Sequence, residues 1–475
     1  MAFLNEFITY LPETVLAGTS VLLIVLITLL PPREKSKREP FSYIALLGLM
    51  GSAFPLLAGL VPQQDNMSIF FKIFFLAATF FVVLFSQHSR ELFKTDTGTY
   101  YLLLIGSSLA LLIIASATHF LILYLALEML SLMTYLLVGS LKGTPRSSEA
   151  AIKYLIYGGT TTGIMLYGMT LFYGISGSLA LNQIAEIMNR QTSLPILFYV
   201  ALLMTLVGIG FKLTMVPFHM WAPDTYEGAP TPIAAFLALI SKAAGLVFLL
   251  RLSLALGMIP EVGAPFLSPL IAVLAIATMT VGNLGLLRQN SIKRLLAYSS
   301  MTHLGYILMG GVSLEPSNLK GIFFYLIIEA VLHLGLFLII ILLNHQETHE
   351  TLSDFQGLAF RGRVGALMAG VLTLFVIGLA GLPPTSGFVS RFHLFETAIR
   401  SQWFGLALIG GANSLLSLWG YTKMIKIIYF KTSQKMAPLR PPGLRDASIL
   451  LTFCIVTVYL GLQWAPLIQW LDRVD

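Results

Sequence analysis

The sequence has few charged residues. Only 11% of its 475 residues are Asp, Glu, Lys or Arg, whereas 56% are hydrophobic. Soluble domains carry charge on roughly a quarter of their residues, so this chain has too little polar surface to cover a globule of its length. No polar segment is long enough to fold alone. We therefore expect lipid to be the solvent for most of the protein.

Cysteine is almost absent as well. The single Cys454 excludes an intramolecular disulfide bond and any Cys-ligated zinc or iron–sulfur centre. The net charge of +7 is spread over connecting segments, so it forms no patch for nucleic acid. A phosphate-binding glycine loop, a dinucleotide fingerprint and a nucleophile–base set are also missing. We expect this chain to hold no cofactor and no metal ion.

Long, continuous apolar stretches fill the rest of the sequence. A membrane β-barrel would instead show alternating segments of about ten residues. Stretches long enough for a membrane-spanning helix lie at 12–30, 41–60, 68–87, 100–117, 119–139, 149–174, 195–216, 231–251, 266–287, 292–312, 321–343, 364–381, 387–430 (in two pieces) and 447–466. We predict an all-α integral membrane protein with about 14 transmembrane helices.

Basic residues alternate between the connections and predict the orientation. The odd-numbered connections hold Arg33, Lys35, Lys37, Arg38, Arg90, Lys94, Lys142, Arg146, Arg288, Arg361, Arg363, Lys431, Lys435, Arg440 and Arg445. Because cytoplasmic loops are enriched in Lys and Arg, we expect odd connections in the cytoplasm and both termini outside. The seventh connection, around 217–230, lacks both residue types and is the exception.

Two proline-containing segments, 216–232 and 381–387, interrupt the helical pattern. Proline removes an amide donor and clashes with the preceding turn. Broken helices at corresponding places in two halves are typical of inverted-repeat transporters and mark their functional sites. We therefore expect discontinuous helices here, although no strict sequence repeat is visible.

Glu128 and Lys242 lie near the middle of the stretches 119–139 and 231–251. Glu128 is about 13 Å from either end of its stretch, and a charge at that depth is costly. We interpret both as proton-transfer residues. A protonated or hydrogen-bonded carboxyl is the alternative for Glu128, and a structural ion pair is the alternative for Lys242.

The roles of Lys212 and Lys153 are less clear from the sequence, because both could reach the membrane interface. Lys212 lies near the end of its apolar run, close enough to reach the interface, but the chain continues from there into the first break. We favour a function in proton transfer for it. Lys153 lies one turn inside its helix, so depth alone favours a side chain that extends to the interface.

Glu329 and His333 share one helix face at i,i+4 spacing. A carboxylate beside a His favours its charged form and can exchange protons with it, whereas two ligands are too few for zinc. Both are candidate relay residues, with a structural role as the alternative. The other candidates are His219 in the first break, Lys293 (otherwise a topology anchor at a helix start), His303, and His393 and Glu396 beyond the second break.

These residue types suit a proton path. Low dielectric favours the neutral form of an isolated Lys, whereas a nearby Glu favours the charged form. A Glu–Lys pair therefore has two states, and a row of such groups linked by His and water can pass protons.

The segment 210–232 reads GFKLTMVPFHMWAPDTYEGAPTP, and SKAAG follows at 241–245. Further motifs are LEMLS at 127–131, AAIKY at 150–154, IKRLLAYSS at 292–300, HLGY at 303–306 and GLPPTSGF at 381–388. Over nearly its whole length the chain resembles the N subunit of bacterial NADH:quinone oxidoreductase (respiratory complex I). That subunit belongs to the antiporter-like family shared with multisubunit Na⁺/H⁺ antiporters.

The resemblance implies three N-terminal helices (1–99), two inverted repeats (100–256 and 257–432) around half-closed proton channels, and a last helix (433–475). It implies that Glu128 pairs with Lys212, that Lys153 lies near that pair and that Lys242 links to a central axis. The family usually has a Lys where this chain has Arg391, the expected exit-side residue. Since Arg stays protonated, either it acts as a fixed charge beside His393 or Glu396, or protons leave by another route.

The same resemblance implies a subunit that couples quinone reduction elsewhere to proton transport. Flavin, iron–sulfur clusters and quinone are expected in partner subunits, and the neighbours are expected to be a small K-like and a large M-like membrane-arm subunit, with lipids around them. The implied location is the bacterial plasma membrane. Two alternatives stay open: a Na⁺/H⁺ antiporter- or hydrogenase-type subunit of the same fold, and a passive structural subunit.

Overall fold

The computed structural model describes residues 8–30, 38–61, 64–191, 193–260, 262–313, 315, 318–346, 350–430 and 439–471, and these ranges contain helices and no β-strand. Arg33, Lys35, Lys37, Lys431 and Lys435, which contribute to the predicted orientation, lie outside the described residues.

The longer helices are α2 (Leu11–Leu29), α4 (Arg38–Leu57), α5 (Asn66–His88), α6 (Thr97–Ser116), α7 (Phe120–Val138), α8 (Pro145–Ser176), α10 (Ile196–Leu213), α13 (Lys242–Gly257), α14 (Ser268–Arg288), α15 (Ile292–Gly310), α16 (Leu319–Gln346), α17 (Gly362–Ala380), α18 (Ser386–Arg400), α19 (Phe404–Phe430) and α20 (Leu444–Leu462). Shorter pieces are η1 (Arg90–Lys94), α9 (Leu181–Asn189), α11 (Trp221–Gly228), α12 (Thr231–Phe236), η2 (Leu237–Ser241), η3 (Gly263–Leu267), η4 (Gly311–Ser313), η6 (Leu352–Phe355), η7 (Leu358–Phe360) and α21 (Ala465–Leu471).

Eleven described helical segments are long and apolar enough to cross a membrane. Three more helices, α8, α15 and α19, have sufficient length at 32, 19 and 27 residues but contain more polar side chains. Together they occupy the apolar stretches found in the sequence. The prediction of an all-α membrane protein is confirmed.

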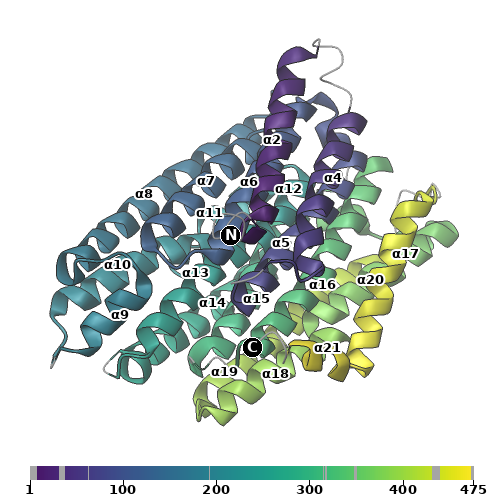
Figure 1. Ribbon diagram of the computed structural model, residues 1–475. Coiled ribbons are helices and arrows are strands. Elements are labelled where there is room, and N and C mark those ends of the chain that lie inside the picture. Colours follow the sequence, from purple (N-terminus) through teal and green to yellow (C-terminus); the bar gives the residue numbers. More distant parts are fainter. Residues whose placement is uncertain are drawn as a thin grey trace.

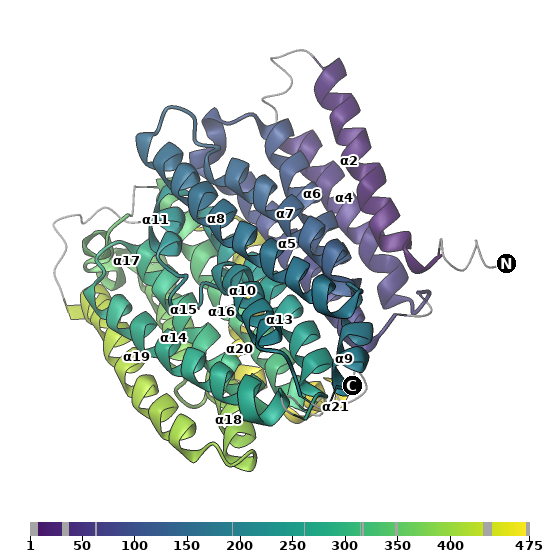
Figure 2. The ribbon, with the colours of Figure 1, turned by 90° about the vertical axis from the view of Figure 1, so that its left-hand side faces the viewer.

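The helices form one bundle with a fully covered centre (Figure 1). The most apolar stretch of the run from α12 through α13 is 100% buried, and that of α16 is 89% buried, whereas those of α2 and α20 are only 22% buried. The view in Figure 2 shows α19 along the outer edge of the bundle and α13, α15 and α16 inside it. The central helices therefore carry the side chains that are most remote from lipid.

The two predicted breaks are present. Helix α10 ends at Leu213, where Thr214 adopts a left-handed conformation (φ 59°), and the chain resumes as α11. Helix α17 ends at Ala380, where Gly381 adopts φ 73°, and the chain resumes as α18. The ranges 100–256 and 257–432 both contain three long helices, a broken helix and a further long helix; their relation by inversion stays a prediction.

A feature that the sequence pattern did not predict lies inside the central run. Helix α12 does not continue directly into α13, because residues Leu237–Ser241 form a π-helical turn, η2. No proline or glycine marks this turn, so its apolar sequence is typical of an ordinary helix. The turn ends immediately before Lys242 and therefore determines the direction of that side chain.

A substitution at Gly387 would test how tightly the helices pack at the second break. A Cβ added at this position would lie 1.9 Å from the carbonyl oxygen of Gly378, whereas one added at Gly370 would meet nothing within 4 Å. We expect Gly387→Ala to separate α17 from α18 and destabilise the protein by roughly 1–3 kcal/mol, as overpacking does. Gly370→Ala should leave the thermal stability of the purified complex unchanged; equal effects of both substitutions would contradict this account.

Candidate functional site

The centre of the bundle contains a buried ion pair between α13 and α16. Lys242 Nζ donates to Glu329 Oε1, to Ser300 Oγ at 3.1 Å and to the Ser300 carbonyl oxygen at 3.3 Å. The Lys242 and Glu329 side chains are 2% and 1% exposed. Two residues that the sequence singled out independently are thus direct partners.

Two histidines extend this pair along α16 and α15. His333 follows Glu329 by one helical turn, and its Nδ1 lies 4.0 Å from Glu329 Oε1. The His303 ring centroid is 5.4 Å from that of His333. His333 Nε2 is buried without a hydrogen-bond partner among the described residues. We call Lys242, Glu329, His333 and His303 the central row.

Tyrosines continue the central row toward α19. The Tyr325 hydroxyl lies 2.5 Å from His303 Nδ1, and the Tyr421 hydroxyl lies 3.5 Å from His303 Nε2. Tyr421 also hydrogen-bonds to Ser299. Because hydroxyl groups both donate and accept, these contacts can pass a proton in either direction.

Arg391 lies in α18 directly after the second break and is 5% exposed. Its guanidinium donates to the carbonyl oxygens of Leu379 and of Ala380, the latter at 2.9 Å, and lies 4.6 Å from the Tyr306 ring centroid. The last carbonyl groups of a helix have no partner within it, and Arg391 supplies one for α17. Arg391 makes no contact with His393 or Glu396 among the described interactions, and its action as a fixed charge stays a prediction.

Lys212 has different partners from those implied by the family resemblance. Its Nζ donates to Ser131 Oγ at 2.9 Å and to the Tyr154 hydroxyl at 3.3 Å, and the residue is 1% exposed. Glu128 lies one turn before Ser131 on α7, and its Oε1 is buried without a hydrogen-bond partner. No Glu128–Lys212 ion pair occurs among the described residues. The hydroxyl groups of Ser131 and Tyr154 contact Lys212 where the resemblance implied Glu128.

Lys212 nevertheless lies next to the helix that carries Lys242. A Cβ added at Gly245 on α13 would be 3.2 Å from Lys212 Cβ, so the two helices touch there. Gly245 follows Lys242 by three residues and shares its helix face. Because Gly245 has no side chain, Lys212 can approach α13 closely and lies near the central row.

Lys153 is placed differently from the family expectation. Its ammonium bonds to Glu149 and to Asp224, both at 2.7 Å, and its side chain is 40% exposed. Arg294 on α15 also bonds to Asp224 and to Glu227, the latter at 3.1 Å. Lys153 thus belongs to a peripheral ionic cluster, as the depth argument predicted, and makes no contact with Lys212 or Glu128 among the described interactions.

Lys293 joins three parts of the chain at the same end of the bundle. It donates to Glu91 at 3.2 Å and to the Ala229 carbonyl oxygen at 2.9 Å. Glu91 also accepts bonds from the backbone amide and hydroxyl group of Thr231, the first residue of α12. A cavity of about 270 Å³, lined in part by Glu91 and Lys293, opens here and gives a polar entrance to the bundle.

The remaining candidate residues lie away from the central row. His219 lies between α10 and α11, with its Nδ1 buried and unpartnered. His393 Nδ1 is 3.4 Å from Glu396, and both line a cavity of about 220 Å³ at the opposite end of the bundle, with Lys320 and Arg400. His393 and Glu396 are therefore candidates for a proton exit rather than for the central row.

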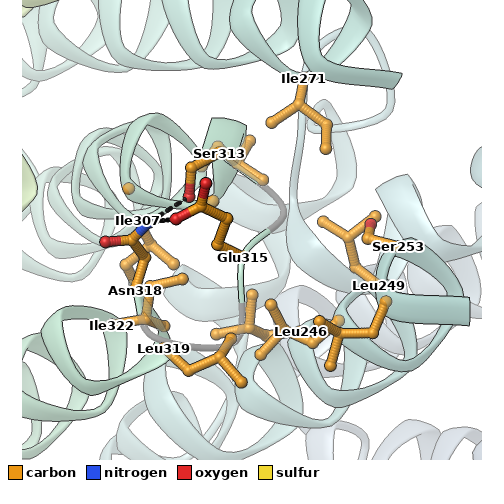
Figure 3. Close-up of a pocket in the computed structure, with 15 residues that line it drawn as sticks. Leu246, Leu249, Ser253, Ile271, Ile307, Ser313, Glu315, Asn318, Leu319 and Ile322 are labelled. Atoms are coloured by element: carbon orange, nitrogen blue, oxygen red, sulfur yellow. Dashed lines mark hydrogen bonds between the residues drawn. The ribbon is translucent and has the colours of Figure 1, made fainter. Parts of the chain in front are cut away.

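Figure 3 shows a second cavity at that end, of about 20 Å³. Leucine and isoleucine side chains make up most of its wall, and Asn318 donates to Ser313 Oγ at 2.8 Å and to Glu315 at its rim (Figure 3). Its size and apolar lining make it a poorer water path than the cavity at His393.

Sequence reasoning missed several buried polar groups. Tyrosines 154, 226, 306, 325 and 421 are all buried around the two lysines and Arg391, and no sequence signal separates them from ordinary core aromatics. Lys72 of α5 is also completely buried and lies 2.5 Å from Glu13 of α2. Lys72 lies only four residues into the apolar run 68–87, as Lys153 does in its own run, so the depth argument that found Lys242 would have assigned it to the interface.

Lys72 and Glu13 allow a test of charge pairing. We expect Lys72→Met to destabilise the protein by about 3–5 kcal/mol, because it leaves a buried carboxylate unpaired, and Lys72→Met/Glu13→Leu to restore most of the loss. Thermal unfolding of the purified complex measures both. Arg190→Met, in an exposed pair with Glu186, should cost less than about 1 kcal/mol. A double variant as unstable as Lys72→Met would contradict pairing as the cause.

Arg391 gives a second test. Arg391→Lys keeps the charge but cannot reach two carbonyl oxygens with one planar group, so we expect a modest loss of thermal stability and retained transport. Arg391→Met leaves both carbonyl groups unpaired and should cost about 1–3 kcal/mol for each. If Arg391→Met were as stable as the parent and only transport were lost, the capping role would be wrong.

Comparison with known proteins adds to this geometry. The family model described as NADH:quinone oxidoreductase/Mrp antiporter, TM, matches residues 117–417. The chain is 35% identical to NADH-quinone oxidoreductase subunit N 2 of Sorangium cellulosum (strain So ce56), over 98% of this chain and 96% of that protein. It is 35% identical to subunit N of Trichlorobacter lovleyi (strain ATCC BAA-1151 / DSM 17278 / SZ), over 90% and 88% respectively.

Solved structures show the same architecture. A chain of respiratory complex I from Thermus thermophilus matches with a TM-score of 0.79 and 28% identity, over 96% of this chain and 98% of that one. A chain of the Mrp complex from Dietzia sp. DQ12-45-1b matches with a TM-score of 0.83 over 99% and 97%, and its 19% identity shows likeness of fold alone.

Proposed function

This chain belongs to the NADH:quinone oxidoreductase/Mrp antiporter transmembrane family, and we propose that it is the N-type, proton-translocating membrane subunit of an NADH:quinone oxidoreductase. The Lys242–Glu329 pair carries this proposal. It joins two helices of the most buried part of the bundle and continues through His333 and His303. A buried ion pair gives little net stability relative to apolar packing, and ionisable residues at this depth typically mark proton relays.

The pair provides two protonation states. While Lys242 and Glu329 are in contact, each stabilises the charge of the other. When they separate, low dielectric favours neutral groups and Lys242 can release its proton. His333 lies next to Glu329 and keeps Nε2 free, so it can receive the proton and exchange it with His303 through water.

The two ends of the bundle supply access in this scheme. Lys293 and Glu91 line the cavity at the predicted cytoplasmic entrance. Lys153 belongs to the neighbouring ionic cluster, and Lys212 lies between that end and Lys242 in this scheme. Arg391 remains charged and holds the second break in place, and its positive charge opposes the retention of a proton on nearby groups. Protons leave past His393 and Glu396, whose cavity opens at the other end.

Redox chemistry lies outside this chain in the proposed complex. Flavin, iron–sulfur clusters and quinone belong to partner subunits, and their reaction changes the charge or position of groups along the membrane arm. The proposed neighbours are a small K-like subunit and a large M-like subunit. The proposed location is the bacterial plasma membrane, with both termini on the outer side.

Likeness of fold to the Mrp complex supports one alternative, a subunit that also moves Na⁺. The two functions differ in ion dependence. Proton transport by the purified complex in vesicles should persist without Na⁺ if the proposed function is right. Transport that requires Na⁺ would favour the antiporter-type function.

Glu329→Gln tests the proposed mechanism. This substitution keeps the shape of the side chain but removes the charge that holds Lys242, so we expect the loss of most proton transport through this subunit, with quinone reduction retained. His333→Ala should reduce transport as well. The measurement is the ratio of protons moved to NADH oxidised by the assembled complex in vesicles.

The matched control is Glu186→Gln, which removes an exposed carboxylate from an i,i+4 pair on α9 and should leave the ratio unchanged. Full transport by both Glu329→Gln and His333→Ala would rule out the central row as the path. Normal assembly and transport in Glu128→Gln and Lys242→Met would favour a passive structural subunit.

A further inference from the structure

A basic cavity lies where α5 and α16 end and α20 begins, on the predicted cytoplasmic side and away from the central row. Its volume is about 570 Å³. We call it the basic cavity; it is lined by His88, Arg90, Leu342, Leu343, Gln346, Arg361, Met368, residues 439–443 and Asp446. The described lining residues thus include three guanidinium groups and one carboxylate.

That carboxylate lies beside the Arg445 guanidinium, which offsets its charge. Asp446 Oδ2 lies 3.3 Å from His88 Nδ1, and Oδ1 lies 3.6 Å from Arg445 Nε. Arg445 in turn donates to Gln87 and His88 at the end of α5. These bonds join the start of α20 to the end of α5. Arg90 and Arg440 form no ion pair among the described residues, so their positive charge can attract an anion.

An apolar groove of about 200 Å³ lies deeper on the same three helices. Its lining residues, apart from Trp470 of α21, are Phe70, Ile73, Phe74, Ala77, Ala78 and Phe81 of α5, Ile327, Ala330, Val331 and Leu334 of α16, and Phe453 of α20. We call this the apolar groove. Almost no polar surface lines it, so it suits a hydrocarbon chain.

The spacing between the two features matches a lipid. Along α16, the groove residues from Leu334 to Ile327 lie about 12 to 22 Å from Leu342 of the basic cavity at 1.5 Å per residue. Half of the hydrocarbon core of a bilayer is about 15 Å thick. A phosphate held in the cavity would therefore place an acyl chain of the same molecule at the groove.

We propose that α5, α16 and α20 bind one anionic phospholipid, with its phosphate in the basic cavity and an acyl chain in the apolar groove. Guanidinium groups bind phosphate with two parallel hydrogen bonds, and basic pockets between transmembrane helices recognise anionic headgroups. Free phosphate fits only the cavity, whereas the lipid occupies both features. The proposal does not depend on proton transport.

The test measures the anionic phospholipid retained by the purified complex after detergent exchange, using mass spectrometry. We expect Arg90→Gln/Arg440→Gln to lower the bound amount by roughly an order of magnitude. Ala77→Trp, which fills the groove without changing charge, should lower it several-fold. Added phosphatidylglycerol should raise the thermal stability of the parent complex more than phosphatidylcholine or inorganic phosphate does.

Matched controls remove the same charge or add the same bulk elsewhere. Arg288→Gln/Arg363→Gln removes two cations at the same end that do not line the cavity, and Leu408→Trp enlarges a lipid-facing residue that is 77% exposed. Both should retain the lipid. Unchanged lipid in Arg90→Gln/Arg440→Gln would overturn the proposal. Stabilisation by inorganic phosphate together with no effect of Ala77→Trp would also overturn it, in favour of a free-phosphate site.

Discussion

Charge in the interior of this bundle needs polar partners from a second helix, and that constraint organises the structure. Lys242 is bonded to Glu329, Lys72 to Glu13, and Arg391 to the carbonyl oxygens that end α17. Each arrangement joins two helices, because no single helix offers both partners. In the proposed mechanism, the Lys242–Glu329 pair thus both takes part in proton movement and joins two central helices.

The sequence was sufficient to identify some of the side chains that lie deep, but not which of them meet. Lys242 was identified by its position in an apolar stretch and Glu329 by its i,i+4 spacing to His333, and both are buried. Their contact joins residues 87 positions apart, and no local pattern encodes such a distance. The breaks after α10 and α17 could be located because Pro217, Pro383 and Pro384 interrupt helical hydrogen bonding locally, whereas the π-helical turn η2 has no comparable residue.

The depth argument and the family resemblance predicted different positions for Lys153. Depth placed it near the interface, and the family resemblance placed it near Lys212; the structure has it bonded to Glu149 and Asp224 in a partly exposed cluster. For Glu128 the family resemblance implied a pairing with Lys212, but Lys212 bonds to Ser131 and Tyr154 instead. Helix periodicity gives depth well, but partners depend on how neighbouring helices rotate about their axes, which sequence spacing does not determine.

The π-helical turn before Lys242 has a consequence for the geometry of the central row. Such a turn accommodates one residue more than an α-helical turn. If η2 were to close into regular α-helical geometry, every side chain beyond it would rotate by about 100° relative to α12. The Lys242 ammonium group would then point toward another helix. The one additional residue in the π-helical turn therefore determines which helix Lys242 contacts.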